Sequence, residues 1–302
     1  MMDQANKLRE IIGNLKIKEP AEKVDDKVNL KSAKVITVTS GKGGVGKTNI
    51  TINLAIALSE MGKRVTVMDA DLGLGNIDVL LGVVPKYTLV DVIYNNKNIV
   101  EVLSEGPGNI KFVAGGSGIE DLAKLDNYQI QKFLANIALL DKISDIILID
   151  TGAGLSDSVM NFVMAADEVI LVTTPEPASI TDAYAIIKAV SKRYSSKTVK
   201  LIINMAENVT EAKNVTNKFS MVTQKFLEID LQPLGFILQD NMVIKAVKAQ
   251  QPFTISFPKS MAAKQIKEIS KKLLDINNNA NNSGGRTGIK SFVNRFVSIL
   301  SG

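Results

Sequence analysis

The stretch that decides the fold is Gly41-Lys42-Gly43-Gly44-Val45-Gly46-Lys47-Thr48. It follows the apolar run VITVTS and precedes a helical pattern that opens at Asn49, the context of a phosphate-binding loop between a strand and a helix. Glycines let backbone N–H groups curve around phosphate oxygens, and the helix N-terminus adds partial positive charge. A glycine turn without a ligand is the alternative, but the complete motif favours a phosphate site over residues 43–49.

Short apolar runs alternate with helical patterns on the C-terminal side of this loop. The candidate strands are RVTVMD, IKFVAG, DIILID, EVILVTT, VKLIIN and LGFIL. Amphipathic segments lie between most of them, at 49–61, 127–140, 178–193 and 211–227. Val/Ile-rich strands that alternate with helices indicate a parallel sheet covered on both faces. We therefore predict an α/β fold over residues 34–276, a mostly parallel, doubly wound sheet of the P-loop NTPase type.

Shorter segments flank this predicted domain. Residues 1–16 contain an amphipathic helical pattern, and the charged, weakly periodic residues 17–33 are typical of a linker. At the other end the polar stretch NNNANNSGG predicts a flexible linker at 277–285, followed by a separate segment at 286–302. We expect a helical N-terminal extension and an amphipathic C-terminal helix.

Absent residue types exclude several chemistries. The 302 residues contain no cysteine and no histidine, so disulfides, thiolate metal sites, and Ser-His-Asp triads are impossible. Any metal must bind oxygen ligands, which favours magnesium or calcium. The N-terminus has no signal-peptide core, and no run of 18 apolar residues is present, so the cytoplasm is the expected compartment.

Two carboxylates are candidates for completing the phosphate site. Asp150 ends the run DIILID, where an aspartate that serves magnesium belongs, together with the Thr48 hydroxyl. Asp71 follows the second strand in DADLGLGN, and Lys47 is placed to reach the β- and γ-phosphates. Gly152, in the segment after Asp150, lies in a candidate switch whose backbone would sense a γ-phosphate; an ordinary glycine turn is the alternative.

Taken together, KGGVGKT, DADLGLGN and LIDTGAGL resemble the deviant-Walker ATPases of the MinD/ParA family over residues 34–275. This resemblance implies ATP or ADP with Mg²⁺ as ligands and a homodimer that forms with ATP. It implies that Lys42 reaches across the dimer to the partner's phosphates. It also implies that Asp71 orients the attacking water, and that Thr48, Asp71 and Asp150 are the candidate residues that serve magnesium.

The same resemblance indicates which residues contact the base. Asn204, at the end of VKLIIN, matches the position that reads adenine, and the loop from Leu238 to Asp240 matches a second base-side segment. Members of the family often have arginine after that asparagine, whereas this chain has Met205. The missing cysteines separate the chain from iron–sulfur carriers of the superfamily.

The N-terminal segment is similar to the DQAxxLR motif of the flagellar-number regulators of the FlhG (YlxH, FleN) family. The matching residues include Asp3, Gln4, Leu8 and Arg9. In that family the motif binds and activates the SRP-type GTPase FlhF, which implies that Gln4 completes the GTPase site of the partner. A frayed helix that packs on its own domain is the alternative.

The C-terminal segment has an apolar arc flanked by the cations Lys290 and Arg295. Six residues recur at helical spacing on one face, namely Ile289, Phe292, Val293, Phe296, Val297 and Leu300. Eight Lys/Arg against two acidic residues from Lys259 onward leave the rest of the chain near neutral. This pattern predicts a helix that lies in the anionic surface of the inner membrane. A helix docked on the domain is the alternative, against which the polar linker argues.

These observations give one expected function and three alternatives. We expect an ATPase that attaches to the inner face of the cell membrane as an ATP-bound dimer and controls flagellar number or placement through an SRP-type GTPase. Flagellar basal-body proteins are further candidate partners, and nucleic acid is not expected because the body is near neutral. The alternatives are a MinD-like division-site organiser, a ParA-like DNA partition ATPase, and an adaptor that binds nucleotide without hydrolysis.

Overall fold

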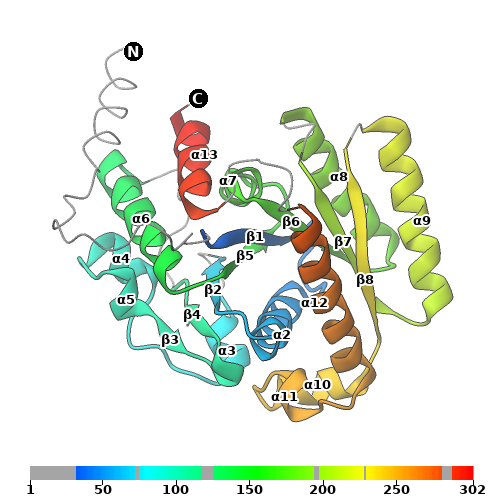
Figure 1. Ribbon diagram of the computed structural model, residues 1–302. Helices are drawn as coiled ribbons and strands as arrows, with labels where there is room; N and C mark the ends of the chain where they lie inside the picture. The colour runs from blue at the N-terminus through cyan, green and yellow to red at the C-terminus, as the bar shows by residue number, and fades with distance from the viewer. Residues whose placement is uncertain are drawn as a thin grey trace.

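The computed structural model describes residues 32–71, 75–116, 125–193, 197–227, 229–280 and 288–301. Its centre is one sheet with the strand order β3-β4-β2-β5-β1-β6-β7-β8, which places β1 beside β5 and β6 (Figure 1). The strands are β1 (Lys34–Ser40), β2 (Val65–Ala70), β3 (Ser104–Glu105), β4 (Lys111–Val113), β5 (Ile146–Ala153), β6 (Glu168–Thr173), β7 (Val199–Ala206) and β8 (Leu231–Leu238).

Every pairing in this sheet is parallel except that of β3 with β4. The seven runs predicted as strands are all strands here, and the mostly parallel sheet is confirmed. The antiparallel β3 was not predicted, because its two residues are too few to show a periodicity.

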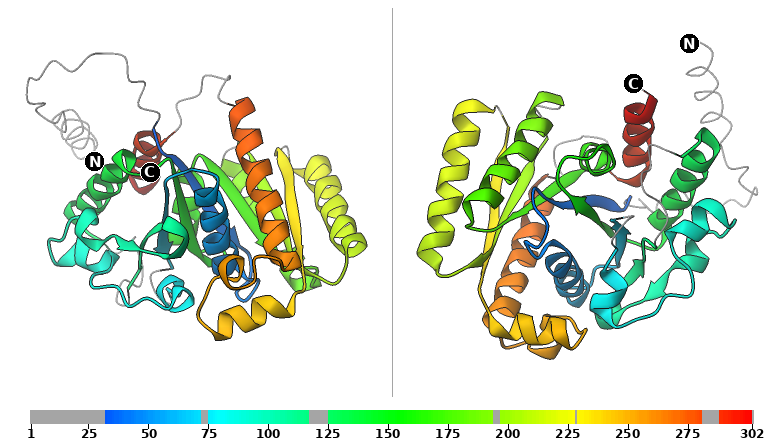
Figure 2. Two further views of the ribbon diagram at one scale, coloured as in Figure 1. Left: turned by 60° about the horizontal axis from the view of Figure 1, so that its bottom comes forward. Right: turned by 180° about the vertical axis from the view of Figure 1, so that it is seen from behind.

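Helices cover both faces of the sheet (Figure 2). They are α2 (Lys47–Glu60), α3 (Ile77–Leu81), α4 (Leu89–Tyr94), α5 (Ile99–Val102), α6 (Asn127–Leu139), α7 (Asp157–Ala165), α8 (Pro177–Arg193), α9 (Val209–Phe226), α10 (Asn241–Lys248), α11 (Phe253–Ser256), α12 (Met261–Ala280) and α13 (Ile289–Ser301), with single 3₁₀ turns at Pro107–Asn109 and Leu140–Lys142.

Alternate residues of β1 point into the two layers of core. Ile36 and Val38 pack with α2 and α12, whereas Val35 packs with α6, α7 and α13. A third cluster joins α7, α8 and α9 to β6 and β7. Burial of both faces explains why the strand sequences are continuous apolar runs without polar alternation.

The boundary of the predicted linker at 277 is wrong, because α12 continues to Ala280. Asparagine is a weak helix former that does not break a helix, and the amphipathic turns before it carry the helix onward. The described part of the chain contains no helix long and apolar enough to cross a bilayer.

The C-terminal helix α13 is docked on the domain, which corrects the expectation of a free apolar face. Ile289, Phe292 and Phe296 are fully buried, and Val293, Val297 and Leu300 pack partly buried against the same core. The Phe296 ring lies 5.2 Å from the ring of Phe162 on α7 and 6.3 Å from that of Phe133 on α6. The apolar arc was identified correctly, but its periodicity does not say which surface covers it.

Candidate functional site

The phosphate-binding loop joins β1 to α2 at the carboxyl edge of the sheet. Gly44 and Gly46 have φ values of 78° and 85°, a left-handed backbone that favours glycine. No side chain caps the start of α2, so the N–H groups of its first turn remain for a ligand. A Cβ on Gly41 would lie 2.3 Å from the Asp182 carbonyl carbon, so glycine there lets the loop approach α8. The loop therefore has the geometry of an anion cradle.

Asp150, near the end of β5, binds three side chains of α2. Lys47 Nζ lies 3.0 Å from Asp150 Oδ1, and the Thr48 hydroxyl donates to Oδ2 at 2.6 Å. The Thr51 hydroxyl lies 3.0 Å from Oδ1 and 3.0 Å from the Lys47 carbonyl. The Asp150 side chain is only 1% exposed, so this ion pair is shielded from solvent. The structure thus brings together Lys47, Thr48 and Asp150, as their sequence positions predict.

Two further aspartates lie beside this network at the end of β2. Asp69 accepts hydrogen bonds from the N–H groups of Asp71 and Ile77. Burial, followed by the charge of Asp150, raises the pKa of Asp69 to about 7. A Cβ on Gly152 would lie 3.7 Å from Asp71 Oδ1, so the carboxylate of Asp71 lies against the candidate switch. Three carboxylates therefore converge near the phosphate loop.

Lys42 lies outside the buried network. Its ammonium group forms an ion pair of 2.8 Å with Glu176, and both side chains are solvent-exposed. The hydrogen bond and charge of Glu176 raise the pKa of Lys42. Lys42 and Lys47 thus occupy different places, although only four residues separate them. Glu176 was not predicted as a site residue, because it lies just before α8 and contacts the loop only through the tertiary fold.

The predicted adenine-side residues have structural partners in this conformation. Asn204 donates to the Val45 carbonyl at 2.7 Å, so it holds the phosphate loop directly. Met205 follows with φ 57°, and its side chain is 40% exposed beside Gly46.

Asp240 caps α10 through Met242 N and also accepts from Ala262 N on α12. Both carboxylate oxygens of Asp240 are therefore engaged by backbone groups. The Leu238 N–H donates to the Gln265 side chain at 2.9 Å. Together these contacts join the end of β8 to α12.

The donor set fits magnesium bound together with a nucleotide. Thr48 and Asp150 offer hard oxygen ligands next to the loop, which is the chemistry that Mg²⁺ prefers. The described residues contain no cluster of three or more acidic, histidine or cysteine side chains placed to hold a metal on their own. Phosphate oxygens and water would therefore supply most of the coordination, as is usual for Mg²⁺.

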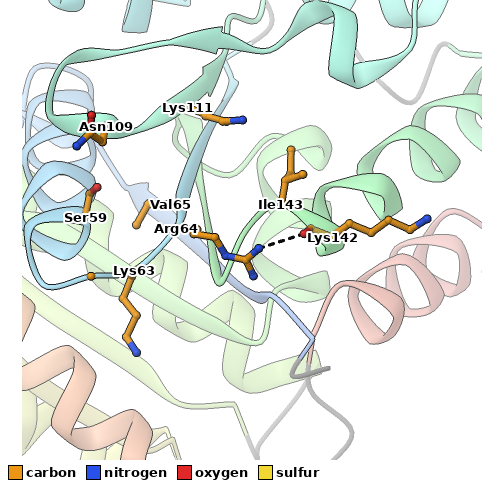
Figure 3. Close-up of a pocket in the computed structure, with 9 residues that line it drawn as sticks. Ser59, Lys63, Arg64, Val65, Asn109, Lys111, Lys142 and Ile143 are labelled. Atoms are coloured by element: carbon orange, nitrogen blue, oxygen red, sulfur yellow. Dashed lines mark hydrogen bonds between the residues drawn. The ribbon is translucent and has the colours of Figure 1, made fainter. Parts of the chain in front are cut away.

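A separate hollow of about 490 Å³ lies at the amino edge of the sheet, away from the phosphate loop (Figure 3). Its lining includes Lys63, Arg64, Lys111 and Lys142. Arg64 donates hydrogen bonds to Asp145, and these lower the pKa of that carboxyl group. The Asp145 carboxylate therefore offsets the positive charge of the Arg64 guanidinium. The hollow belongs to the start of β2 and β4 and shares no lining residue with the nucleotide site.

The predicted partner-binding residues belong to the N-terminal segment at 1–16. Asp3, Gln4, Leu8 and Arg9 lie outside the described residues, as do most of the residues predicted as the first linker. Their role stays a prediction.

A glycine loop between the central strand and its helix, with a lysine and a threonine on a buried aspartate, defines a P-loop nucleoside triphosphatase. A model of the ParA family, described as NUBPL iron-transfer P-loop NTPase, matches residues 31–274. The chain belongs to the MinD/ParA family of P-loop ATPases.

Several named proteins are similar to this chain. Antiactivator FleN of Pseudomonas aeruginosa is 43% identical over 79% of this chain and 85% of its own. The flagellum site-determining protein YlxH of Helicobacter pylori is 32% identical over 99% of this chain and 100% of its own. A structure of the septum site-determining protein MinD from Pyrococcus horikoshii, complexed with Mg-ADP, has a TM-score of 0.68 at 26% identity and covers 81% of this chain and 97% of that one.

Proposed function

We propose that this chain regulates flagellar number or placement through an ATP-driven cycle of dimerisation and membrane attachment. The observation that carries the proposal is the end-to-end similarity to YlxH, which spans 99% of the chain and so includes its N-terminal segment. A MinD relative from Bacillus subtilis, 32% identical, covers 80% of the chain. The two ends of the chain therefore favour a flagellar over a division-site role.

In this proposal, the loop and its two lysines bind and polarise the phosphates. Lys47 leaves Asp150 to contact the β- and γ-phosphates, and bound magnesium supplies further charge neutralisation. Lys42 leaves Glu176 for the phosphates of a second copy, because an exposed ion pair is weak enough to exchange. Asp71 holds the attacking water near Gly152.

The docked position of α13 adds a condition to membrane attachment. The apolar arc packs on α6 and α7, so lipid can reach it only after the helix leaves. The helix α7 begins just after Gly152 and Gly154, the candidate switch, and its other end supports α13. We propose that ATP-bound dimers release α13 and that two helices together bind anionic lipid, since linked sites gain effective concentration.

A vesicle experiment tests this condition. The chain is mixed with phosphatidylglycerol vesicles and sedimented with ATP, with ADP, and after deletion of residues 286–302. We expect sedimentation only with ATP and only when the tail is present. Binding of equal strength with ADP, or without the tail, would contradict the proposed attachment.

The N-terminal segment is proposed to activate an SRP-type GTPase. A peptide of residues 1–16 should stimulate GTP hydrolysis by an FlhF-type partner, and Gln4→Ala should lower the stimulated rate more than the affinity. Leu8→Asp is the matched control, because it removes an apolar contact and should weaken binding itself. An inert peptide, together with normal stimulation by the chain lacking it, would overturn this assignment.

A division-site function is the second candidate, because two MinD relatives are 32% and 34% identical to this chain where they align, and YlxH is 32% identical. Deletion of the gene separates the two. Under the flagellar proposal, electron microscopy shows an altered number or position of flagella, with cytoplasmic protein recruited to the inner face of the membrane. Minicells with normal flagella would support division-site control. Binding to duplex DNA with ATP would support a partition function.

A further inference from the structure

The C-terminal end of α7 receives two cations from distant parts of the chain. Lys197 Nζ, just before β7, donates to the Met164 carbonyl at 2.5 Å. Arg295 Nε, on α13, donates to the Ala165 carbonyl at 2.7 Å. The last carbonyls of a helix lack partners within it and carry partial negative charge, which attracts both cations. The two cations therefore repel each other at one helix end.

Arg295 also anchors α13 to a buried carboxylate. One of its terminal guanidinium nitrogens lies 2.6 Å from Asp167 Oδ1, and the Asp167 side chain is 1% exposed. The second oxygen of Asp167 accepts from Val35 N and from Gly288 N, the residue before α13. Docking of the tail thus depends on polar contacts that Arg295 makes at the same helix end that Lys197 occupies.

We propose that Lys197 and Arg295, bound side by side at the C-terminal end of α7, repel each other, so that α13 docks tightly when Lys197 is neutral and is loosened when Lys197 carries its proton. This inference concerns the docking equilibrium alone. It holds whether or not the released helix binds lipid.

The charge state of Lys197 is set by its surroundings. Burial, and then the charge of Arg295, lower the pKa of Lys197 to about 7, while Asp167 opposes the shift. Arg295 belongs to α13 and Asp167 to the turn between α7 and β6. The adjacent Glu168 is paired with Lys34 and Lys200, at 2.6 Å and 2.7 Å. Neutral Lys197 is therefore the form that the docked tail favours.

The direction of the pH effect follows from linkage. When α13 leaves, the charge of Arg295 leaves with it, so the pKa of Lys197 rises toward the usual value of about 10.4. The released state then binds more protons than the docked state, and acidification favours release. If the whole shift arises from docking, the docked-to-released ratio falls about tenfold between pH 8 and pH 6.

Spin labels can measure this ratio in the full chain, because it has no cysteine of its own. Labels at Asn294→Cys on α13 and Ala135→Cys on α6 occupy exposed positions on two helices that belong to one core. Double electron–electron resonance then gives the docked and released populations as separate distances, without lipid or nucleotide. We expect the docked population to dominate at pH 8 and the ratio to fall up to tenfold at pH 6.

Lys197→Met removes the charge and keeps the stem, so the ratio should become independent of pH and lie above the value of the unmodified chain at pH 8. The matched control is Lys188→Met, an exposed lysine on α8, which should keep the full pH response. A second readout needs no substitution at 197. In the chain with ¹³Cε-labelled lysines, a lysine should titrate near pH 7, and deletion of 286–302 should return it to the normal range, whereas Lys200, whose pKa burial also lowers, should be unaffected.

Two results would overturn the proposal. One is a pH response that Lys197→Met leaves intact, or a ratio that is constant from pH 6 to pH 8 in the chain with Lys197. The other is a near-neutral lysine titration that persists after the tail is removed, or that is absent from the full chain.

Discussion

Two aspartates at opposite edges of the sheet are buried to the same degree and have different kinds of partners. Asp150 and Asp167 are each 1% exposed, and each pairs with one cation. All the side chains that bind Asp150 come from α2, the helix that follows the phosphate loop. Asp167 instead joins β1 to the C-terminal tail through Val35, Gly288 and Arg295.

This difference separates a site built for a ligand from one that holds a removable part of the chain. The Asp150 contacts join β5 to α2 within the central core, so the two elements stay packed even when Lys47 turns to a bound phosphate. The Asp167 contacts hold a terminal helix that can leave while the sheet stays folded. Buried charges are costly when they lose a partner, so substitutions at the two edges should have distinct consequences.

The largest effect is expected at the carboxyl edge and on chemistry. Asp71→Ala should lower ATP hydrolysis by about 10²–10⁴-fold, the usual loss on removal of a group that positions or activates the nucleophile. Nucleotide binding and ATP-dependent dimerisation should persist, because Asp71 lies beside Gly152 and outside the Lys47–Asp150 pair. Phosphate release measures the rate, with Asp78→Ala as a control on α3. Near-normal turnover would place the catalytic group elsewhere.

The next effect is expected at the amino edge and on docking. Phe296→Ala removes a buried ring that contacts Phe133 and Phe162, and such truncations cost about 3–5 kcal/mol. Hydrogen exchange of residues 289–301 should become fast, while the strands remain protected. Asn294→Ala, on the exposed side of the same helix, is the control. If strand protection falls together with that of α13, the tail is an integral part of the domain and the comparison fails.

A smaller effect, on the free energy of unfolding, tests how much the Thr51–Asp150 contact contributes. Thr51→Val removes a hydroxyl that lies 3.0 Å from the buried carboxylate, and should lower the free energy of unfolding by about 1–3 kcal/mol. The matched control is Thr223→Val on α9, because the buried Thr223 hydroxyl bonds the carbonyl four residues earlier and its hydrogen bonds go to backbone carbonyls. Urea denaturation of both variants gives the difference. Equal losses would show that the Asp150 contact adds little.

The smallest effect on stability is expected at Lys42. Its ion pair with Glu176 is exposed, so Lys42→Ala should leave the thermal unfolding midpoint unchanged. ATP-dependent dimerisation, followed by light scattering, should be lost if Lys42 acts across the dimer. A variant that dimerises with normal affinity would refute that role.

Local patterns predicted the carboxyl edge well, and they predicted the amino edge poorly. The loop, its strand and its helix are contiguous, so their order in sequence fixes their geometry, and a carboxylate ending the neighbouring strand must face them. Thr51 was missed, although its position one turn after Lys47 on the same helix is a usable signal. Glu176 gave no such signal, because 134 residues separate it from its partner Lys42.

The C-terminal helix α13 also shows that a local sequence pattern does not determine tertiary contacts. Helical periodicity predicted the apolar arc of α13 correctly, but an arc that fits a membrane also fits a groove. Arg295 was interpreted as a cation flanking a lipid-facing arc, whereas it binds the buried Asp167, 128 residues away. That pairing depends on where the turn between α7 and β6 lies in the fold, which no local pattern records.

The short helix α7 has consequences for chimaeric proteins made from this family. Its nine residues span about 14 Å, with the candidate switch at one end and the seat of α13 at the other. In its middle, the Phe162 carbonyl accepts a hydrogen bond from Thr37 of β1, while the Phe162 ring packs on Phe292 and Phe296. Replacing α7 with that of a relative exchanges both ends at once. Grafting α13 alone onto a relative transfers an apolar helix without the surface that shields it, so helix and seat need to be moved as one unit.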